Sequence, residues 1–437
     1  MPRKAIILGA AGRDFHNFNV FFRNNKHFKV IAFTATQIPY ISNRKYPPKV
    51  SGRMYPKGIP IYDEEKMVEL IKKHGVQDVY FSYSDVSHQH VMNLASKAMA
   101  AGASFHLLGP KDTELKSKKP VISIVATRTG AGKSTISRYV SSIIKSIGKK
   151  PVVVRHPMPY GDLNKIVQRF ETYEDLAKYN ITIEEREEYE QHIDTGTTVF
   201  AGVDYMKVLK EVEKEGDVII WDGGNNDMPF YKPTINICVA DPFRFEDTLS
   251  SFPGEVNFRS ADVIVINKVN VSPMGNIGKL EKIAKREVPN ALVVKTSSEA
   301  KLDKPELVKG KKVLVVEDGP TITHGGLSEA VGAFISKKLG ATLVDPRDRS
   351  VGSIKEAFQR FPHIGSVMPA LGYSSEQLED LEKSISRVEC DAVVLGTPSN
   401  ISKVISINQP VARVWFEAKE VGEELLKERL INILQNI

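Results

Sequence analysis

Residues 121–135 read Val-Ile-Ser-Ile-Val-Ala-Thr-Arg-Thr-Gly-Ala-Gly-Lys-Ser-Thr. The mainly apolar and β-branched opening predicts a buried strand, and the residues from Lys133 onward predict a helix. Between them, Gly130 and Gly132 carry no side chain, so backbone N–H groups can turn inward around an anion. The positive end of the helix dipole points at the same place. The stretch therefore predicts a phosphate-binding loop with both of the flanks that such a loop requires.

Three side chains in this loop predict a bound nucleoside triphosphate with Mg²⁺. Lys133 would bridge the β- and γ-phosphates, the Ser134 hydroxyl would ligate Mg²⁺, and Thr135 would hold the α-phosphate. Two residues at a later strand end complete the predicted site. The nucleotide-binding residues that we predict are Thr129, Gly130, Ala131, Gly132, Lys133, Ser134, Thr135, Asn267 and Lys268.

The loop departs from the usual phosphate-binding motif at its start, where Thr127 stands in place of glycine. This opening resembles the deviant motif of the SIMIBI division of P-loop proteins, with Arg128 at the position of the extra signature lysine. An arginine there would place a second positive charge on the transferring phosphoryl group, and we predict that it is catalytic. The alternative is an arginine solvated at the rim of the site.

Length and charge narrow the class of protein. A chain of 437 residues predicts two or three domains. Its 60 basic and 53 acidic residues are spread without an arginine-rich arm, which argues against a nucleic-acid partner and allows a small polyanionic substrate. Two distant cysteines, Cys238 and Cys390, favour a reducing cytoplasm. Because we find no signal-peptide pattern and no membrane-spanning run, we expect a soluble cytoplasmic protein with no membrane partner.

Residues 1–118 alternate strand-like and helix-like segments, beginning with strands at Ala5–Leu8 and Val30–Phe33. Such alternation predicts a Rossmann-like, doubly wound α/β domain. After the first strand, a glycine turn leads into Arg13 and His16, whose polar side chains are unusual where a loop enters a helix. We predict an anion or substrate site there. The alternative is a domain used only for packing or dimerisation, and we expect a homodimer.

Residues 119–310 are predicted to form a P-loop NTPase domain with a mainly parallel sheet. A strand that begins at Pro151 ends in Arg155 and His156, and the carboxyl ends of parallel strands are where α/β folds bind ligands. We therefore expect both side chains on the nucleotide side, with Asp162 within reach of the metal. The alternative for this loop is a rim that carries surface charges.

Another strand ends in Asp222, which is followed by Gly223 and Gly224. A carboxylate at such a strand end holds Mg²⁺ through water, and the glycines let the backbone approach the γ-phosphate. We predict that Asp222 is catalytic and a metal ligand. The next strand places Arg244 at the same edge. His192 with Asp194 is a less favoured candidate for an acid/base or metal pair.

A stretch that begins at Asn267 and Lys268 and ends at Asn270 resembles the base-reading Asn-Lys-x-Asp motif of GTPases. The aspartate that accepts two guanine hydrogens is replaced by Asn270, whose amide offers only one acceptor oxygen. This replacement weakens guanine selectivity. We predict ATP as the cosubstrate, with GTP as the alternative.

Residues 311–437 resume the alternation, with Val313–Val316 as the first strand. Glu317 and Asp318 follow it in a polar turn, where a substrate-facing loop would lie. We predict a smaller α/β region that either extends the central sheet or forms a domain of its own.

Six stretches together resemble the archaeal cyclic 2,3-diphosphoglycerate synthetase family, and they span most of the chain. The resemblance implies ATP-dependent closure of 2,3-diphosphoglycerate into its cyclic pyrophosphate, with release of ADP and phosphate. Members of the wider group are also described only as GTPases, so the resemblance does not settle the substrate. The stretches are residues 9–19, 127–134, 155–162, 221–226, 240–244 and 317–320.

The residues themselves are compatible with that chemistry. Joining two phosphates of one small molecule needs a phosphoryl transfer and cations that hold the pair in line. Lys133, Arg128 and Asp222 would serve the nucleotide side. Guanidinium donors match phosphate oxygens, and the substrate-binding residues that we predict are Arg13, Arg155, His156 and Arg244.

Two other functions are compatible with these motifs. One is a different ligase of the SIMIBI type, in which phosphoryl transfer activates a carboxylate or a carbamate. The other is a regulatory GTPase or a metal-insertion chaperone that uses hydrolysis to switch a partner interface. The absence of a Cys-x-Cys or histidine tract argues against the metal version, and Asn270 argues against strict use of GTP.

Overall fold

The computed structural model describes residues 1–36, 44–156, 162–179, 181, 183–224, 226–323, 326–371 and 374–436. By its contacts the chain divides into two compact units. The first contains residues 1–180, 192–298 and 418–437, and the second contains residues 181–191 and 299–417. The domain boundaries that we predict after residues 118 and 310 are not decided by this division and stay predictions.

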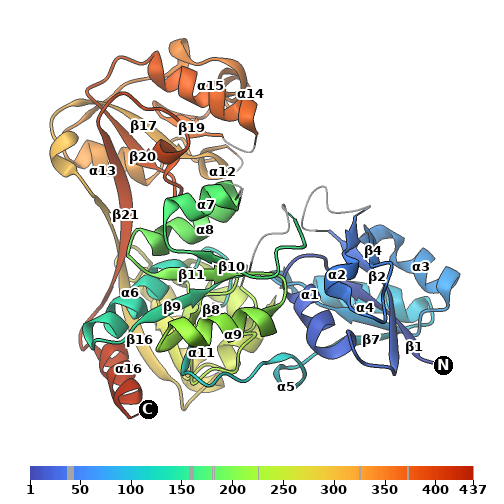
Figure 1. Cartoon of the computed structure of the whole chain (residues 1–437). Coiled ribbons are helices and arrows are strands. Elements are labelled where there is room, and N and C mark those ends of the chain that lie inside the picture. The colour runs from blue at the N-terminus through green and yellow to red at the C-terminus, as the bar shows by residue number, and fades with distance from the viewer. Residues whose placement is uncertain are drawn as a thin grey trace. The chain divides into compact units, whose positions relative to one another are not determined.

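The N-terminal part of the first unit is built on a six-stranded sheet, drawn in blue tones in Figure 1. Its strands are parallel except for the first in the order, which is antiparallel to its neighbour. The order is β3 (Lys45–Tyr46), β4 (Ile59–Asp63), β2 (Phe28–Ala35), β1 (Arg3–Leu8), β5 (Asp78–Phe81) and β7 (Ser104–Leu107).

Both faces of this sheet are covered, as the predicted doubly wound pattern requires. Along β1, Ala5 and Ile7 face one core, whereas Ile6 and Leu8 face the other. Because side chains alternate along a strand, a strand buried on both faces reads as a continuous apolar run. The helices of the two layers are α1 (Arg13–Asn17), the π-helix Phe18–Phe22 and α2 (Pro48–Ser51) on the first core, and α3 (Met67–His74) and α4 (His88–Ala100) on the second.

The predicted P-loop strand, β8 (Val121–Ala126), lies inside a second sheet of the first unit. From β10 to β16, neighbouring strands of this sheet are parallel except the outermost pair, β10 and β11. The carboxyl ends of β8, β9 and β12 therefore share one edge. The order is β10 (Gln168–Phe170), β11 (Thr198–Ala201), β9 (Pro151–Val154), β12 (Val218–Trp221), β8, β13 (Ile235–Ala240), β15 (Val263–Ile266) and β16 (Leu292–Leu302).

Helices flank this second sheet, and one of them joins the two units through the chain. The helix α8 (Ile183–Ile193) has its residues up to 191 in the second unit, whereas His192 belongs to the first. The other helices of the first unit are α5 (Pro110–Thr113), α6 (Lys133–Ser146), α7 (Tyr173–Lys178), α9 (Tyr205–Glu215), α10 (Gly254–Arg259), α11 (Met274–Glu287) and α16 (Leu425–Gln435).

The second unit is a smaller α/β body with parallel strands, and residues 418–437 belong to the first unit. The C-terminal region predicted over residues 311–437 therefore stays a prediction. The central strand of the second unit, β17 (Lys312–Asp318), places Val313 and Val315 on one core and Leu314 and Val316 on the other. The remaining elements are β18 (Thr342–Leu343), β19 (Met368–Ala370), β20 (Ala392–Gly396), β21 (Val411–Glu420), α12 (Gly319–Ile322), α13 (Val331–Lys338), α14 (Gly352–Arg360) and α15 (Ser375–Ser386).

Within the first unit, the N-terminal sheet is tied to the P-loop sheet by specific contacts. The strands β6 (Val86–Ser87) and β14 (Ser251–Phe252) pair in antiparallel fashion across the two parts. Arg23 donates to Asp204 at 2.7 Å. These contacts hold the loop after β1 beside the carboxyl ends of β9 and β12.

Candidate active site

The P-loop has the backbone that its glycines predict. Gly130 has φ 87° and Gly132 has φ 98°, both in the left-handed region that favours glycine. Gly132 also caps α6, and a Cβ atom there would lie 2.2 Å from Nδ2 of Asn267. A side chain at position 132 would therefore displace both the loop and its neighbour.

Asn267 and Lys268, predicted to bind the nucleotide, contact the P-loop directly. Asn267 Nδ2 donates to the Ala131 carbonyl at 3.0 Å, and Lys268 Nζ donates to the Gly130 carbonyl at 2.7 Å. Asp241 fixes the same ammonium group at 2.7 Å. These side chains hold the shape of the loop from the end of β15.

Lys133 lies at the start of α6, with its ammonium group turned towards the end of β12. Its Nζ donates to the Asp222 carbonyl at 2.5 Å and lies 3.8 Å from Asp222 Oδ1. Burial lowers the pKa of Lys133 to about 8, although the charge of Asp222 opposes that change. The charge on this lysine is therefore sensitive to its surroundings.

Asp222 is the centre of a buried charge network. Arg155 Nη1 donates to its Oδ2 at 2.6 Å, and His192 Nε2 lies 2.8 Å from the same oxygen. Burial opposes ionisation, but the charges of Arg155 and Lys133 hold the pKa of Asp222 well below its usual range. We call Lys133, Arg155, His192 and Asp222 the Asp222 network. His192 was only a less favoured candidate, and its predicted partner Asp194 instead accepts from the Tyr173 hydroxyl at 2.7 Å.

The donor set fits the Mg²⁺ ion that the motif implies. Oδ1 of Asp222 is buried and accepts no hydrogen bond from any residue that the structure describes. Mg²⁺ is commonly held by one or two protein oxygens together with phosphate oxygens and water. No cluster of three or more His, Cys, Asp or Glu side chains that could hold a metal occurs in the described part of the chain. Ser134 and Asp222 therefore remain the predicted ligands.

A second buried cluster joins the loop after β1 to the segment after β12. Arg13 Nε lies 3.7 Å from Asp227 Oδ1, and its Nη2 donates to the Met228 carbonyl. His156 Nε2 lies 2.8 Å from Asp227 Oδ2. The guanidinium stands over the Phe230 ring, 4.8 Å from its centroid. We call Arg13, His156 and Asp227 the Asp227 cluster.

Several polar atoms of the Asp227 cluster are buried without a hydrogen bond from the described residues. They are Nε and Nη1 of Arg13, Nδ1 of His156 and Oδ1 of Asp227, whereas Nε2 of His156 lies 2.8 Å from Oδ2 of Asp227. Buried polar groups are nearly always satisfied, so such a concentration indicates a ligand site. Asp227 was not predicted; the polar run after Gly223 and Gly224 is the only sequence signal that could have identified it.

His16, which we expected beside Arg13, has a packing role. Its ring stacks on Phe230 with the centroids 3.9 Å apart, and Nε2 lies 2.6 Å from the Thr113 carbonyl. Burial lowers the pKa of His16 to about 3, so the ring is neutral at physiological pH. A neutral, stacked histidine cannot supply the positive charge of an anion clamp.

Arg128 and Arg244 are not brought to the two buried clusters. Arg128 Nε lies 3.4 Å from Asp85 and 3.5 Å from Asp247, at the side of the loop where Asp85 also accepts from the Thr129 N–H. The Arg244 side chain is exposed. The catalytic role of Arg128 and the substrate role of Arg244 stay predictions.

Asp162, predicted to reach the metal, is exposed. Its Oδ1 accepts from the Asn164 backbone N–H at 2.9 Å and from the Asn164 side chain at 2.8 Å. These hydrogen bonds hold the pKa of Asp162 below its usual range. The carboxylate thus closes a local turn, and its metal role stays a prediction.

Comparison with known proteins places the chain in a family. No family model matches it. Over 430 residues it is 54% identical to arginine synthetase ArcE from Thermococcus kodakarensis, covering 98% of this chain and 96% of that protein. The chain belongs to the arginine synthetase ArcE family.

The ArcE family is distantly related to the family that the sequence motifs resemble. The chain is 24% identical over 293 residues to cyclic 2,3-diphosphoglycerate synthetase from Thermococcus sibiricus, covering 60% of this chain and 66% of that protein. The corresponding protein of Thermococcus kodakarensis is 22% identical over 256 residues, which cover 51% and 59%. The expected resemblance is thus confirmed at the level of a distant relationship.

Among solved structures, the ArcE-family chain matches LpxK from Aquifex aeolicus, determined in complex with ATP, with a TM-score of 0.50 and 16% identity. The match covers 74% of this chain and 90% of LpxK. The match shows that the two chains share a mixed α/β fold with mostly parallel strands. Among the described helices, none combines the length and apolar character that crossing a membrane requires.

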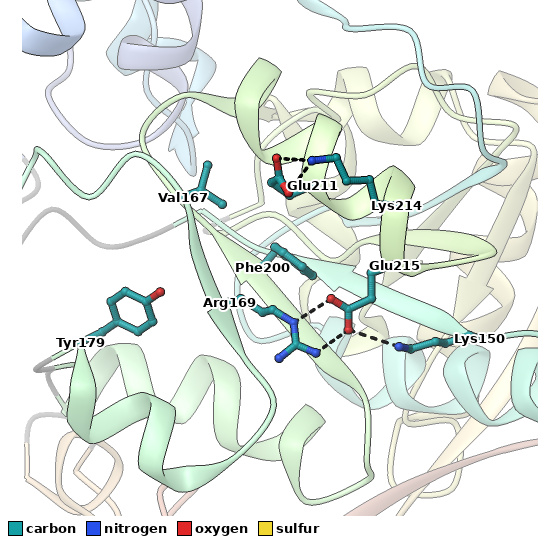
Figure 2. Close-up of a pocket in the computed structure, with 8 residues that line it drawn as sticks. All are labelled: Lys150, Val167, Arg169, Tyr179, Phe200, Glu211, Lys214 and Glu215. Carbon is teal, nitrogen blue, oxygen red and sulfur yellow. Dashed lines mark hydrogen bonds and ion pairs between the residues drawn. The ribbon is translucent and has the colours of Figure 1, made fainter.

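An open pocket of about 540 Å³ in this ArcE-family chain lies away from both clusters. Figure 2 shows Arg169 and Lys150 directed at Glu215, with Lys214 paired to Glu211. Lys150 precedes β9, whereas Arg155 follows it, so the pocket is at the opposite end of that strand from the Asp222 network. Each of its charged side chains is already paired with another, and we assign it no part in the candidate site.

Proposed function

We propose that this chain makes arginine by transferring the γ-phosphoryl group of ATP to the ureido oxygen of citrulline and replacing the phosphate formed there with nitrogen. The observation that carries the proposal is the 54% identity to an arginine synthetase over 98% of the chain. The P-loop and the Asp222 network support the use of a nucleotide. The Asp227 cluster beside them supports a second, separately held substrate.

The chemistry explains why such a reaction needs a phosphoryl donor. Arginine differs from citrulline by one nitrogen in place of the ureido oxygen, and that oxygen is a poor leaving group. Phosphorylation converts citrulline into an isourea phosphate. Nitrogen attack on the central carbon then expels phosphate, an anion that leaves readily. Catalysis of the first step consists mainly of positioning and charge stabilisation.

The Asp222 network would serve the nucleotide. Lys133 would contact the β- and γ-phosphates, and Mg²⁺, held by Ser134 and Asp222, would neutralise phosphate charge when bound. Arg155 and His192 fix the orientation of Asp222 through Oδ2 and leave Oδ1 for the metal side. The lysine must leave its contact with the Asp222 carbonyl to reach a nucleotide.

The Asp227 cluster would hold the second substrate. Nε and Nη1 of Arg13 are buried donors with no hydrogen-bond acceptor among the described residues. A guanidinium fork matches the oxygens of a phosphoryl group. Arg13 would therefore stabilise the negative charge of the isourea phosphate.

Closure of 2,3-diphosphoglycerate is a second candidate, favoured by the similarity to two cyclic 2,3-diphosphoglycerate synthetases. Both reactions start with γ-phosphoryl transfer to an oxygen of a small molecule. The same cations would hold either acceptor. Product analysis is therefore needed to decide which of the two acceptors the chain uses.

The deciding experiment incubates the purified chain with ATP or GTP, Mg²⁺, citrulline and ¹⁵N-ammonium. We expect ¹⁵N in the guanidino group of arginine, with one ADP and one phosphate formed for each arginine. A parallel reaction with 2,3-diphosphoglycerate is followed by phosphorus NMR. A cyclic pyrophosphate without any arginine would overturn the proposal in favour of the second candidate. Hydrolysis that ignores both substrates would indicate another ligase or a regulatory switch.

Nucleotide affinity should weaken with rising pH. Because burial lowers the pKa of Lys133 to about 8, the free chain loses this positive charge above that pH. The dissociation constant of a non-hydrolysable ATP analogue should then rise by up to about tenfold per pH unit, as titration calorimetry from neutral pH upward can measure. Lys133→Arg keeps its charge and should show no such rise. A parent affinity that is constant across this range would contradict the assignment.

Alanine at Gly224 should disable the Asp227 cluster. A Cβ there would lie 2.2 Å from Cε1 of His156, so the imidazole must move. Displacement of a reacting group by about 1 Å can cost about 10²-fold in rate, and we expect turnover to fall by at least that factor. Gly278→Ala in α11 is the matched control, since its Cβ meets nothing within 4 Å. The control should keep full activity; similar losses in both variants would refute the explanation.

A further inference from the structure

The geometry points to His156, oriented by Asp227, as the base that removes a proton from the nitrogen nucleophile. This inference rests on the proposed arginine-forming reaction. Ammonium and amines are protonated at neutral pH, and a protonated nitrogen has no lone pair to attack carbon. A synthetase of this kind therefore needs a proton acceptor beside the activated carbon, in addition to its nucleotide site.

His156 and Asp227 form a buried carboxylate–imidazole pair. Nε2 of the ring lies 2.8 Å from Oδ2 of Asp227, and the exposed fractions of the two side chains are 5% and 3%. Burial opposes ionisation of Asp227, but its contact with His156 and the charge of Arg13 hold its pKa below the usual range. An ionised carboxylate fixes the N–H on the ring nitrogen that faces it, which leaves Nδ1 as the bare acceptor.

Nδ1 is the atom that would take the proton. It is buried and has no hydrogen-bond partner among the described residues. The faces of the ring are enclosed by backbone, since Cβ atoms at Gly12 and Gly224 would lie 2.8 Å from Nδ1 and 2.2 Å from Cε1. The Phe230 ring lies nearly parallel, with its centroid 6.0 Å away. Two glycines from different segments thus hold the imidazole in place, while Nδ1 keeps its capacity to accept a proton.

The position of the pair suits the reaction. Gly224 follows Asp222 by two residues, and Arg155, the residue before His156, contacts Asp222. Arg13 on the other side of Asp227 offers its unpaired donors to the isourea phosphate. The acceptor for the proton therefore lies between the nucleotide side and the group that stabilises the leaving phosphate.

The other buried histidines are less suited to this role. Burial lowers the pKa of His16 to about 3, which makes it a weak base near neutral pH. His192 contacts Asp222, and burial lowers its pKa as well. Neither belongs to the Asp227 cluster.

The atoms and charges balance. The ammonium proton moves to Nδ1 of His156, and the freed nitrogen lone pair forms the new bond to the isourea carbon. The bond from that carbon to the phosphate oxygen breaks, and hydrogen phosphate leaves with the bonding electron pair and a proton from the added nitrogen. The neutral guanidine then takes the proton from His156. The products are arginine, phosphate and the imidazole in its starting form.

The test compares two nucleophiles on His156→Gln and the parent chain, with ATP, Mg²⁺ and citrulline constant. Ammonium needs deprotonation, whereas hydroxylamine is largely unprotonated at neutral pH. We expect arginine formation from ammonium to fall by about 10²- to 10⁴-fold. Formation of N-hydroxyarginine from hydroxylamine should fall by less than about tenfold, and the KM for ATP should stay within about twofold, because the variant leaves the P-loop unchanged.

Equal losses with the two nucleophiles, or no loss with ammonium, would overturn the inference. Should the glutamine variant fail to fold, Asp227→Asn provides the same comparison, since it leaves the imidazole but removes the carboxylate that orients it. Asp227→Asn should slow arginine formation from ammonium less than His156→Gln does, and it should leave the reaction with hydroxylamine nearly unchanged. An equal loss with hydroxylamine would overturn the inference too. If the parent chain makes no arginine from either nucleophile, the proposed function fails, and not merely the assignment of the base.

Discussion

Replacing Lys133 with alanine should lower kcat/KM for ATP by about 10³-fold or more, because a positive group on the transferring phosphoryl is worth about 10³- to 10⁵-fold in phosphoryl-transfer enzymes. The variant loses the only lysine of the glycine loop, whose Nζ donates to the Asp222 carbonyl. Steady-state kinetics would measure the loss of turnover, and calorimetry with an ATP analogue would measure the loss of nucleotide affinity.

The same substitution should leave stability nearly unchanged. Burial already disfavours the charged form of Lys133, and Asp222 keeps its contacts with Arg155 and His192. A loss of activity with an unchanged urea midpoint would therefore separate nucleotide chemistry from folding. Lys285→Ala, at an exposed position in α11, is the matched control and should retain parent activity. Parent-like nucleotide affinity and turnover in Lys133→Ala would refute the nucleotide site.

Asp222→Asn should lower the free energy of unfolding by about 3 to 5 kcal/mol, the usual cost of removing one partner from a buried ion pair. The amide keeps the shape of the carboxylate but leaves Arg155 and Lys133 without their counter-charge. It should also abolish turnover, since the predicted metal ligand loses its charge. Urea denaturation at neutral pH measures the first effect.

The difference in the free energy of unfolding between the parent and Asp222→Asn should depend on pH with a definite sign. The folded chain holds the pKa of Asp222 below its usual value, so the stabilisation by the ionised carboxylate is complete above the unfolded-state pKa of about 4 and is lost as the pH falls below it. The parent and Asp222→Asn should therefore converge in acid. Asp217→Asn removes an exposed carboxylate and should change stability by less than about 0.5 kcal/mol. Equal losses in the two variants would contradict the proposed network.

The P-loop and the strand-end aspartate could be predicted because their physics is local. Gly130 and Gly132 are needed where the backbone takes positive φ, and the strand and helix on either side follow from nearby apolar residues. Asp222 directly follows the apolar run of β12, so its place at a strand end could also be predicted from its neighbours. Parallel strands then bring Arg155 and Asp222 to one edge, which the strand pattern also predicts.

The identity of the reaction could not be predicted from these residues. The motifs indicated a phosphoryl-transfer enzyme and resembled cyclic 2,3-diphosphoglycerate synthetases, whereas the alignment over nearly the whole chain identifies the ArcE family. Loops and charges of similar kind would serve both proposed reactions, because each would begin with transfer of a phosphoryl group.

The sequence by itself determined the phosphate-binding loop, the alternating strands and helices, and the strand ends on which charged residues stand, since each depends on neighbours a few positions away. Only the tertiary structure decided which charges meet. Asp227 contacts Arg13, more than two hundred residues earlier, whereas Arg128 pairs with Asp85 and Asp247 beside its own loop. Such pairings depend on how two sheets pack, and the energy of a buried charge depends on the partners that this packing supplies.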